Sequence, residues 1–595
     1  MPEGTAPAAE RADPAVPTTA VVAPPGSPEP AGAPEPAGAP GGPAAPGLSA
    51  TRSEVAFHGE RSGRAPLTWG QRAIWHAIRR TAPNDHYFNI GRVLPLADRG
   101  RPATVPEALS ALARLMERHA SLRTRLLLSP QGGEPAQILT DAGTLSVTIT
   151  RAAGLPEAAA GAEALLGRLS ATRFDYSAQW PVRVALVTVG DRVTHVVLVL
   201  CHLAADGHAA EILVRDLRLL VRRGSAGRPP ATTPLDLARD QHAAAGRRRG
   251  AAALAHWEAG YRAAPPTMFP DPRAEPRSPR FWTGRLVSPA LARAVGAVAA
   301  AHRVSGSTVL LTASAALVAA GEGHRTAAVM PIVGNRTTGA LRDLVSTLSQ
   351  DGLFVLDLAD AASPTEPSGP GDAGDSTGTA GFPESSGLAE AAGLPESSGL
   401  AEAAGLPEAS GLPEGAGLAE PSGRAEAAGG PGPVTGGREP TFTDLLPAAY
   451  RAALRGYRAA VYDPVEWDAL GERLSAEYGT DVHPYCCFND MRLVERVLPA
   501  GPPATPQELA EARRRTVFGF PATQDRVACR YCLHVTEEGD ALAVSLTADT
   551  AYLPPEAIRA HLYALEELVV ASAAGAPPPL TGLRTLLETA GGDRP

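Results

Sequence analysis

The chain of 595 residues contains no lysine, so all 54 basic residues are arginines. This absence excludes chemistry that depends on a lysine side chain: Schiff-base catalysis, pyridoxal phosphate attachment and the phosphate-binding lysine of P-loops. Only five cysteines are present, and an odd number in a long chain is not the pattern of a disulfide framework. Apolar runs fall short of the roughly 20 residues that span a bilayer. The first residues lack the basic and apolar regions of a signal peptide. We therefore expect a cytoplasmic protein that does not bind membranes.

The net charge of −9 is concentrated in one segment. Residues 361–438 hold eleven acidic residues and two arginines, a net charge of −9, so the rest of the chain is neutral. Since no part of the chain reads as a basic domain, we do not expect a nucleic-acid partner.

Two segments have compositions typical of disorder. Residues 1–52 are rich in Pro, Ala and Gly, and we expect a disordered tail there. Between residues 381 and 429 a glycine recurs every six positions. Such hexads can build a left-handed β-helix, but here a single Leu in each unit is flanked by Pro and Glu. We therefore predict a disordered acidic insert over 361–438.

Between these segments the sequence predicts two α/β units. The first covers 53–225 and the second covers 226–360 and 439–580. In the first, Thr68 is placed to cap a helix over 69–80, and a further helix is predicted over 106–120. Residues 183–189 and 192–200 predict a hairpin across Gly190-Asp191.

Other elements are predicted from periodicity and capping residues. They are a strand start at 87–90, one helix over 235–262, a helix over 288–302 capped by Ser288, strands at 344–358, 485–489 and 529–535, and a last helix over 554–573.

The hairpin delivers the chain to Cys201-His202-Leu203-Ala204-Ala205-Asp206-Gly207, and a helix is predicted over 208–223. A helix N-terminus supplies free N–H groups and positive potential. Beside it His202 can act as a general base or a positioned donor, while Gly207 allows close approach to backbone N–H. Asp206 can cap the helix or hold a cation. The alternative is a capping Asp-Gly pair beside an incidental histidine.

This stretch resembles the His-His-x-x-x-Asp-Gly motif of the condensation-domain superfamily of nonribosomal peptide synthetases. Further segments resemble that family's landmarks in the same order along about 53–575. They are Leu67-Thr68-Trp69-Gly70-Gln71, Arg118 to Arg125, Phe174-Asp175-Tyr176, Val345 to Leu358, Asp463-Pro464-Val465-Glu466 and Phe488-Asn489-Asp490.

The resemblance implies an α+β fold. It consists of two chloramphenicol-acetyltransferase-like subdomains in a V-shaped pseudo-dimer, with the active histidine in a tunnel between them. It implies acyl or peptidyl carrier proteins and a small-molecule nucleophile as partners. Because the sequence shows no adenylation motif and no Gly-Gly-x-Ser carrier context, we expect the carriers to act in trans. It implies no permanently bound cofactor, because the phosphopantetheine-linked thioester is a substrate. We expect a monomer.

The resemblance also assigns roles to residues. His202 matches the catalytic histidine, and the Gly207 N–H is a candidate for oxyanion binding. Asp206 is expected to be structural and to lie within salt-bridge distance of Arg336. Cys201 stands where the family has its first, supportive histidine. A nucleophilic Cys201 is the alternative, although the thiol closes an apolar strand. Gln350 stands where the family has an asparagine.

Three functions remain open. The first is attack of an amine on a carrier-bound acyl thioester, which forms an amide. The second is ester formation with a hydroxyl acceptor and a CoA or carrier thioester. The third is a catalytically silent protein that binds a carrier.

The remaining cysteines allow two readings. Cys486-Cys487 with Cys529-x-x-Cys532 could form a four-sulfur zinc site, but paired Cys-x-x-Cys motifs on both sides are missing. We favour buried thiols and expect no metal.

Overall fold

The computed structural model describes residues 50–96, 103–129, 132–362, 438–492 and 504–590. The predicted acidic insert, apart from residues 361, 362 and 438, and the predicted tail, apart from residues 50–52, lie outside these ranges. Apart from Pro367–Glu439, the chain forms one compact unit. Within it lie two large mixed sheets, one built mainly before residue 201 and the other after residue 280. We call them the N-terminal sheet and the C-terminal sheet.

The N-terminal sheet has the strand order β1-β6-β7-β8-β3, with only β6 and β7 parallel. Its strands are β1 (Ala50–His58), β3 (Ile90–Pro95), β6 (Ala142–Ala152), β7 (Val182–Val189) and β8 (Arg192–Leu200). A smaller sheet joins β2 (Gly63–Pro66), β5 (Ala136–Leu139) and β4 (Thr124–Leu127).

Strand β8 is apolar along most of its length because helices cover both of its faces. Helix α3 packs on one face and α2 contacts the other. The helices of this part are α1 (Trp69–Thr81), α2 (Val105–Arg118), α3 (Leu155–Ser170) and α4 (Gly207–Arg223). The predicted capping by Thr68 is present, as part of a capping box with Gln71.

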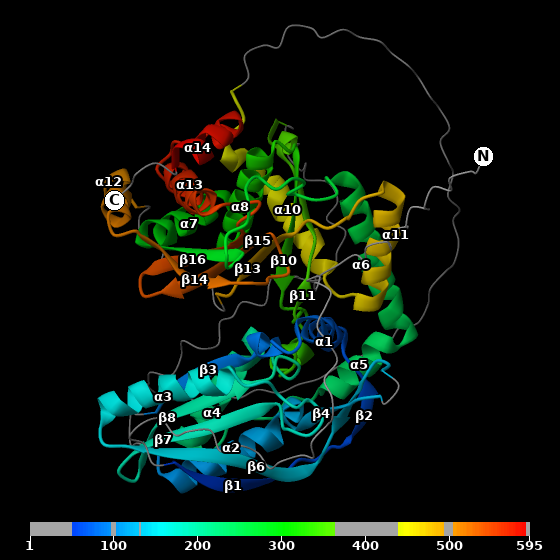
Figure 1. Cartoon of the computed structure of the whole chain (residues 1–595), viewed down its shortest axis with the longest axis vertical. Coiled ribbons are helices and arrows are strands. Elements are labelled where there is room, and N and C mark those ends of the chain that lie inside the picture. The colour runs from blue at the N-terminus through cyan, green and yellow to red at the C-terminus, as the bar shows by residue number, and fades with distance from the viewer. Residues whose placement is uncertain (1–49, 97–102, 130–131, 363–437, 493–503, 591–595) are drawn as a thin grey trace, which may run out of the picture. The chain divides into compact units, whose positions relative to one another are not determined.

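The C-terminal sheet has eight strands in the order β11-β10-β13-β15-β16-β9-β14, with β12 also paired to β10. They are β9 (Phe281–Ser288), β10 (Thr326–Val333), β11 (Gln350–Asp351), β12 (Phe354–Asp357), β13 (Cys486–Asp490), β14 (Val517–Gln524), β15 (Tyr531–Glu538) and β16 (Ala541–Asp549). Helices α7 (Pro289–His302), α8 (Gly306–Glu322) and α13 (Pro555–Ala573) cover one face, as Figure 1 shows, and form the largest core.

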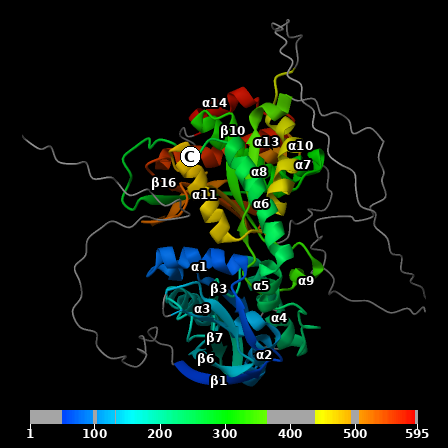
Figure 2. The same cartoon turned by 90° about the vertical axis from the view of Figure 1, so that its right-hand side faces the viewer.

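The remaining helices are α5 (Pro234–His242), α6 (Ala244–Ala263), α9 (Gly339–Arg342), α10 (Leu446–Arg458), α11 (Pro464–Tyr478), α12 (Pro506–Arg513) and α14 (Leu583–Ala590). Helices α6 and α11 lie side by side in Figures 1 and 2. Trp257 of α6 contacts Trp467 of α11 edge to face. No single helix in the described ranges passes as a membrane span. One pair, α7 with α8, passes only jointly and is bent by 102°.

Several predicted elements need correction. The strand start predicted at residues 87–90 is confirmed only at Ile90, where β3 begins, since Asp85–Phe88 is a 3₁₀ helix. The buried Asp85 binds Arg173 and the Tyr176 hydroxyl, so a tertiary contact sets this segment. The single helix predicted over 235–262 is broken at Ala243, whose ψ is 163°.

Other limits also differ from the predicted ones. Strand β1 begins at Ala50, inside the predicted tail, and α14 lies beyond the predicted limit of residue 580, where it packs on α8 and α13. The strand predicted over 344–358 is confirmed only for β11 and β12. Residues 344–349 form a loop instead. The strand predicted from residue 529 begins at Tyr531, so Cys529 lies in the preceding loop.

Candidate active site

The candidate active site is the turn between β8 and α4. The Cys201 N–H still donates to the Pro181 carbonyl as a continuation of the sheet, at 2.9 Å, and the Ala204 N–H then donates back to Cys201 O. Asp206 caps α4 by accepting from the Ala209 N–H at 2.9 Å. The predicted strand-to-helix junction is therefore present, with His202 in the turn and Gly207 as the first helical residue.

Side chains from three distant segments hold the carbonyl groups of this turn. Gln71 Nε2 donates to Leu203 O at 3.3 Å, and Ser121 Oγ donates to Ala204 O at 2.5 Å. The Thr347 hydroxyl donates to His202 O. Because buried carbonyls need partners, these contacts fix the turn from several sides. They also give a physical reason for three of the segments that resemble family landmarks.

Asp206 is the most heavily hydrogen-bonded residue of the motif. Arg336 donates to both of its oxygens, at 2.8 and 2.9 Å, and the two side chains are only 4% and 8% exposed. Burial by itself raises the pKa of Asp206, but Arg336 and the amides of Ala209 and Leu348 more than offset it, so the pKa is lowered. The predicted ion pair is confirmed, and an ionised carboxylate with all its partners in place is not a proton donor.

His202 is half-buried, and its ring lies 6.5 Å from the ring of Phe88. Its Nδ1 is 3.4 Å from Thr347 Oγ1. The single hydroxyl hydrogen of Thr347 is already donated to His202 O, so the Oγ1 atom accepts from Nδ1–H. This arrangement favours the tautomer with the proton on Nδ1 and a lone pair on Nε2. Burial lowers the pKa of His202, which favours this neutral ring.

Gly207 is exposed, and a Cβ atom built on it would meet nothing within 4 Å. It stands in the first turn of α4, where backbone N–H groups have no partner within the helix. The space over this helix end is therefore open, and the helix dipole favours negative charge there.

Cys201 is buried among apolar and aromatic side chains. It is 2% exposed and packs in a cluster with Trp75, Phe174 and Leu203. Burial raises the pKa of its thiol to about 12. The geometry therefore speaks against the nucleophilic alternative, because the thiolate is the reactive form.

Sequence reasoning missed Thr347 and Phe88 as parts of the site. Thr347 lies within the segment that resembles a family strand motif, but its contact with His202 depends on the fold. Gln350, in the position of the family's asparagine, donates from Nε2 to Tyr462 O at 3.0 Å and is 5% exposed. This bond links β11 to the segment before α11. Gln350 makes no contact with His202 among the contacts found in the described residues.

The alternative of a four-sulfur zinc site is wrong, because Cys486 does not lie with the other three cysteines. Cys486 belongs to the large apolar core beneath α7, α8 and α13. Its neighbour Cys487 faces the other side of the sheet, where it meets Cys529 and Cys532. Alternation along β13 separates the two adjacent cysteines, so four sulfurs cannot converge.

Comparisons with known proteins agree on one family. The family profile described as Condensation domain matches residues 61–356. Phosphinothricin tripeptide synthetase PhsC of Streptomyces viridochromogenes is 30% identical over 296 residues, which cover 48% of this chain and 26% of PhsC. Isonitrile lipopeptide synthase of Mycobacterium tuberculosis is 32% identical over 181 residues, which cover 30% of this chain and 7% of that protein. The matches thus span about a quarter or less of these relatives.

Solved structures show the fold. The condensation domain of the monacolin K polyketide synthase MokA superposes with a TM-score of 0.58 at 14% identity, covering 88% of this chain and all of that one. The SgcC5 protein of Streptomyces globisporus superposes with a TM-score of 0.55 at 17% identity, covering 86% of this chain and all of SgcC5. The sequence matches and the shared α+β fold show that this chain belongs to the condensation-domain superfamily of nonribosomal peptide synthetases.

Proposed function

We propose that the protein forms an amide by attack of an amine on an acyl thioester carried on the phosphopantetheine arm of a carrier protein. The observation that carries the proposal is the setting of His202: its Nδ1 faces the Thr347 hydroxyl, and burial lowers its pKa, which together favour a neutral ring with a lone pair on Nε2. Such a nitrogen can accept a proton from the attacking amine.

In the proposed reaction a C–N bond forms and the C–S bond of the thioester breaks. His202 Nε2 takes the proton that the amine loses and returns it to the departing thiolate of the phosphopantetheine arm. Negative charge that develops on the carbonyl oxygen is stabilised by the open N-terminus of α4 at Gly207. Asp206 has no proton to exchange and serves to hold the turn.

The relatives support carrier-bound substrates, since condensation domains work beside carrier domains in peptide synthetases such as PhsC. In the proposal the carriers are separate proteins and the condensing protein is a monomer. A hydroxyl acceptor would use the same Nε2 and give an ester. It is therefore tested in parallel.

The test uses the full chain with a carrier protein loaded with an aminoacyl or short fatty acyl phosphopantetheine. Amino acids, aminoacyl carriers and diols serve as acceptors, and products are identified by mass spectrometry. We expect amide products whose rate of formation falls about 10²–10⁴-fold in His202→Ala, the usual contribution of a positioned base.

The matched control is His302→Ala, since His302 is exposed at the end of α7 and outside the site. It should retain the full rate. Equal rates in the wild type and His202→Ala would contradict the mechanism. Ester products alone would contradict the amine acceptor, and no product from any pair would favour a carrier-binding protein without activity.

A further inference from the structure

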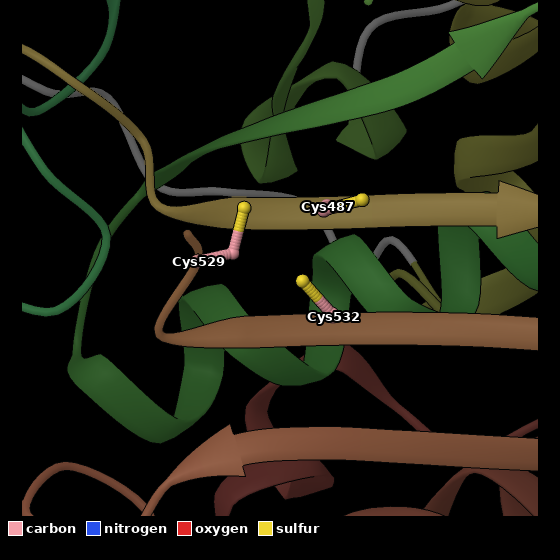
Figure 3. A group of neighbouring side chains, drawn as sticks. All are labelled: Cys487, Cys529 and Cys532. Atoms are coloured by element: carbon pink, nitrogen blue, oxygen red, sulfur yellow. The ribbon is translucent and has the colours of Figure 1, made fainter. Parts of the chain in front are cut away.

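Three cysteines gather at the start of two neighbouring strands of the C-terminal sheet. Cys487 on β13 and Cys532 on β15 are register partners, and Cys529 precedes Cys532 by three residues in the loop that enters β15. Figure 3 shows the side chains of Cys529 and Cys532 reaching toward the strand that carries Cys487. All three sulfur atoms lie within 4.8 Å of one another. We call them the thiol triad.

The triad lies on the face of the sheet that the covering helices leave free. Cys487 and Cys532 are 8% and 7% exposed, while Cys529 is half-buried. The inner thiols are therefore shielded from water, and the Cys529 side is open enough to admit a small ion. A structural disulfide could use only two of the three sulfurs.

The spacing suits a tetrahedral metal ion with sulfur ligands. Zinc binds thiolates at about 2.3 Å, which places sulfurs roughly 3.8 Å apart in a tetrahedron. Small side-chain rotations would close the observed spacing to that value. Cys529-x-x-Cys532 has the chelating spacing found in zinc sites, and Cys487 supplies a third ligand from the adjacent strand.

Within the described parts of the chain, no fourth histidine, cysteine or carboxylate offers a ligand atom within 4.8 Å of all three sulfurs. The Asp351 carboxylate interacts electrostatically with Cys487 and Cys529 but does not meet that spacing. Three protein ligands with one free position is the arrangement of zinc sites that bind water or an outside ligand. A soft, sulfur-rich set favours zinc over magnesium or calcium, which prefer oxygen.

We propose that Cys487, Cys529 and Cys532 bind one zinc ion and leave its fourth coordination position open. This site is independent of the proposed acyl transfer, because none of its ligands belongs to the motif around His202.

The test begins with the intact wild-type chain, reduced, freed of metal and titrated with Co²⁺ and with Zn²⁺. We expect one ion per chain by elemental analysis. Cobalt should show the thiolate charge-transfer absorption and the visible bands of a tetrahedral site, and zinc should displace it. Bound zinc should also protect Cys529 from alkylation, as read by mass spectrometry.

Single substitutions then identify the ligands. Cys487→Ser, Cys529→Ser and Cys532→Ser should each weaken zinc binding by at least about 100-fold. Cys486→Ala is the matched control, because it changes the adjacent cysteine on the opposite face and should keep the full stoichiometry. Circular dichroism verifies that each variant is folded.

Two results would overturn the site without reliance on any variant. One is a reduced wild-type chain that takes up no Co²⁺ or Zn²⁺. The other is bound cobalt without thiolate charge transfer. Undiminished zinc binding in all three serine variants would overturn it as well.

Discussion

His202 and Asp206 are four residues apart in one turn, yet the fold leaves them in opposite states. Arg336 and three backbone amides occupy the oxygens of Asp206, two of them from Leu348 and Ser349. The Nδ1 atom of His202 contacts Thr347, and its Nε2 atom has no hydrogen bond to another side chain or to the backbone among those found in the described ranges. The local residue pattern leaves open whether Asp206 is an acid or a structural residue, because its partner Arg336 lies 130 positions away, and only the resemblance to the family predicted this pair.

The first prediction concerns pH. Burial lowers the pKa of His202, so its neutral, proton-accepting form persists below the ordinary histidine value of 6.5. The acid limb of kcat/KM should therefore lie below about pH 6.5. A pH–rate profile with a good acyl-carrier substrate measures it. An acid limb above that value would show that a different group titrates.

The second prediction concerns the Arg336–Asp206 pair. Arg336→Ala leaves a buried carboxylate without its cation, which costs about 3–5 kcal/mol of unfolding free energy. Urea denaturation monitored by tryptophan fluorescence measures the loss. Arg325→Ala is the control. Arg325 is 74% exposed and pairs with Asp357 at the surface, so its loss should change the unfolding free energy little. Equal losses in the two variants would contradict the buried pair's special role.

At the scale of elements, prediction succeeded where the determinants are local. Thr68 before α1 and Ser288 before α7 cap helices in the structure as predicted, since each side chain bonds an amide three residues on. The hairpin of β7 and β8 turns at Gly190, whose φ is +64°. Prediction failed where packing decides. Apolar periodicity continues across Ala243, but the Gly246 backbone there approaches Gln241 O so closely that a Cβ would lie 2.2 Å away.

Helices α1 and α11 meet through charged side chains. Arg72 of α1 donates to Asp463, the N-cap of α11, at 2.8 Å. His76 Nδ1 lies 3.5 Å from Asp468, and His76 Nε2 lies 3.0 Å from Glu134. Asp463 is part of a segment that resembles a family landmark, and this contact gives it a structural role.

The third prediction follows from His76. The hydrogen bond to Asp468 raises the pKa of His76 in the folded state, and the bond to Glu134 raises it further. Together they outweigh desolvation, which lowers it. Its stabilisation is thus complete below the unfolded pKa and is lost as pH rises through the raised folded value. The difference in unfolding free energy between the wild type and His76→Gln should be larger near pH 5.5 than near about pH 9. Urea denaturation at both values tests it, and a difference independent of pH would contradict the charged contact.

At the scale of the whole molecule, residues far apart in sequence converge in ways that no linear pattern reveals. The fold class was predictable from the order of several motifs. The separation of Cys486 from Cys487, and the meeting of Cys487 with Cys529 and Cys532, required the register of β13 against β15. Likewise, three separate segments close on the turn at His202, which only the assembled chain shows.

The fourth prediction concerns the segment 363–437. The 3₁₀ helices Leu358–Ala362 and Phe442–Leu445 contact each other, so the ends of this segment are held near one another. Replacement of 363–437 by a short Gly-Ser linker should leave the fold intact. It should also stabilise it slightly, since each halving of a loop saves about 0.6 kcal/mol of closure entropy. Urea denaturation measures this, and a variant that fails to fold would contradict it.

The Asp206 carboxylate has a mechanical consequence. It joins the start of α4, in the first half of the chain, to Arg336 and to the loop amides of Leu348 and Ser349 in the second half. Any swing of one half against the other that keeps these bonds must turn about this point. His202, four residues away, would then lie close to the rotation axis, where the displacement of atoms is smallest.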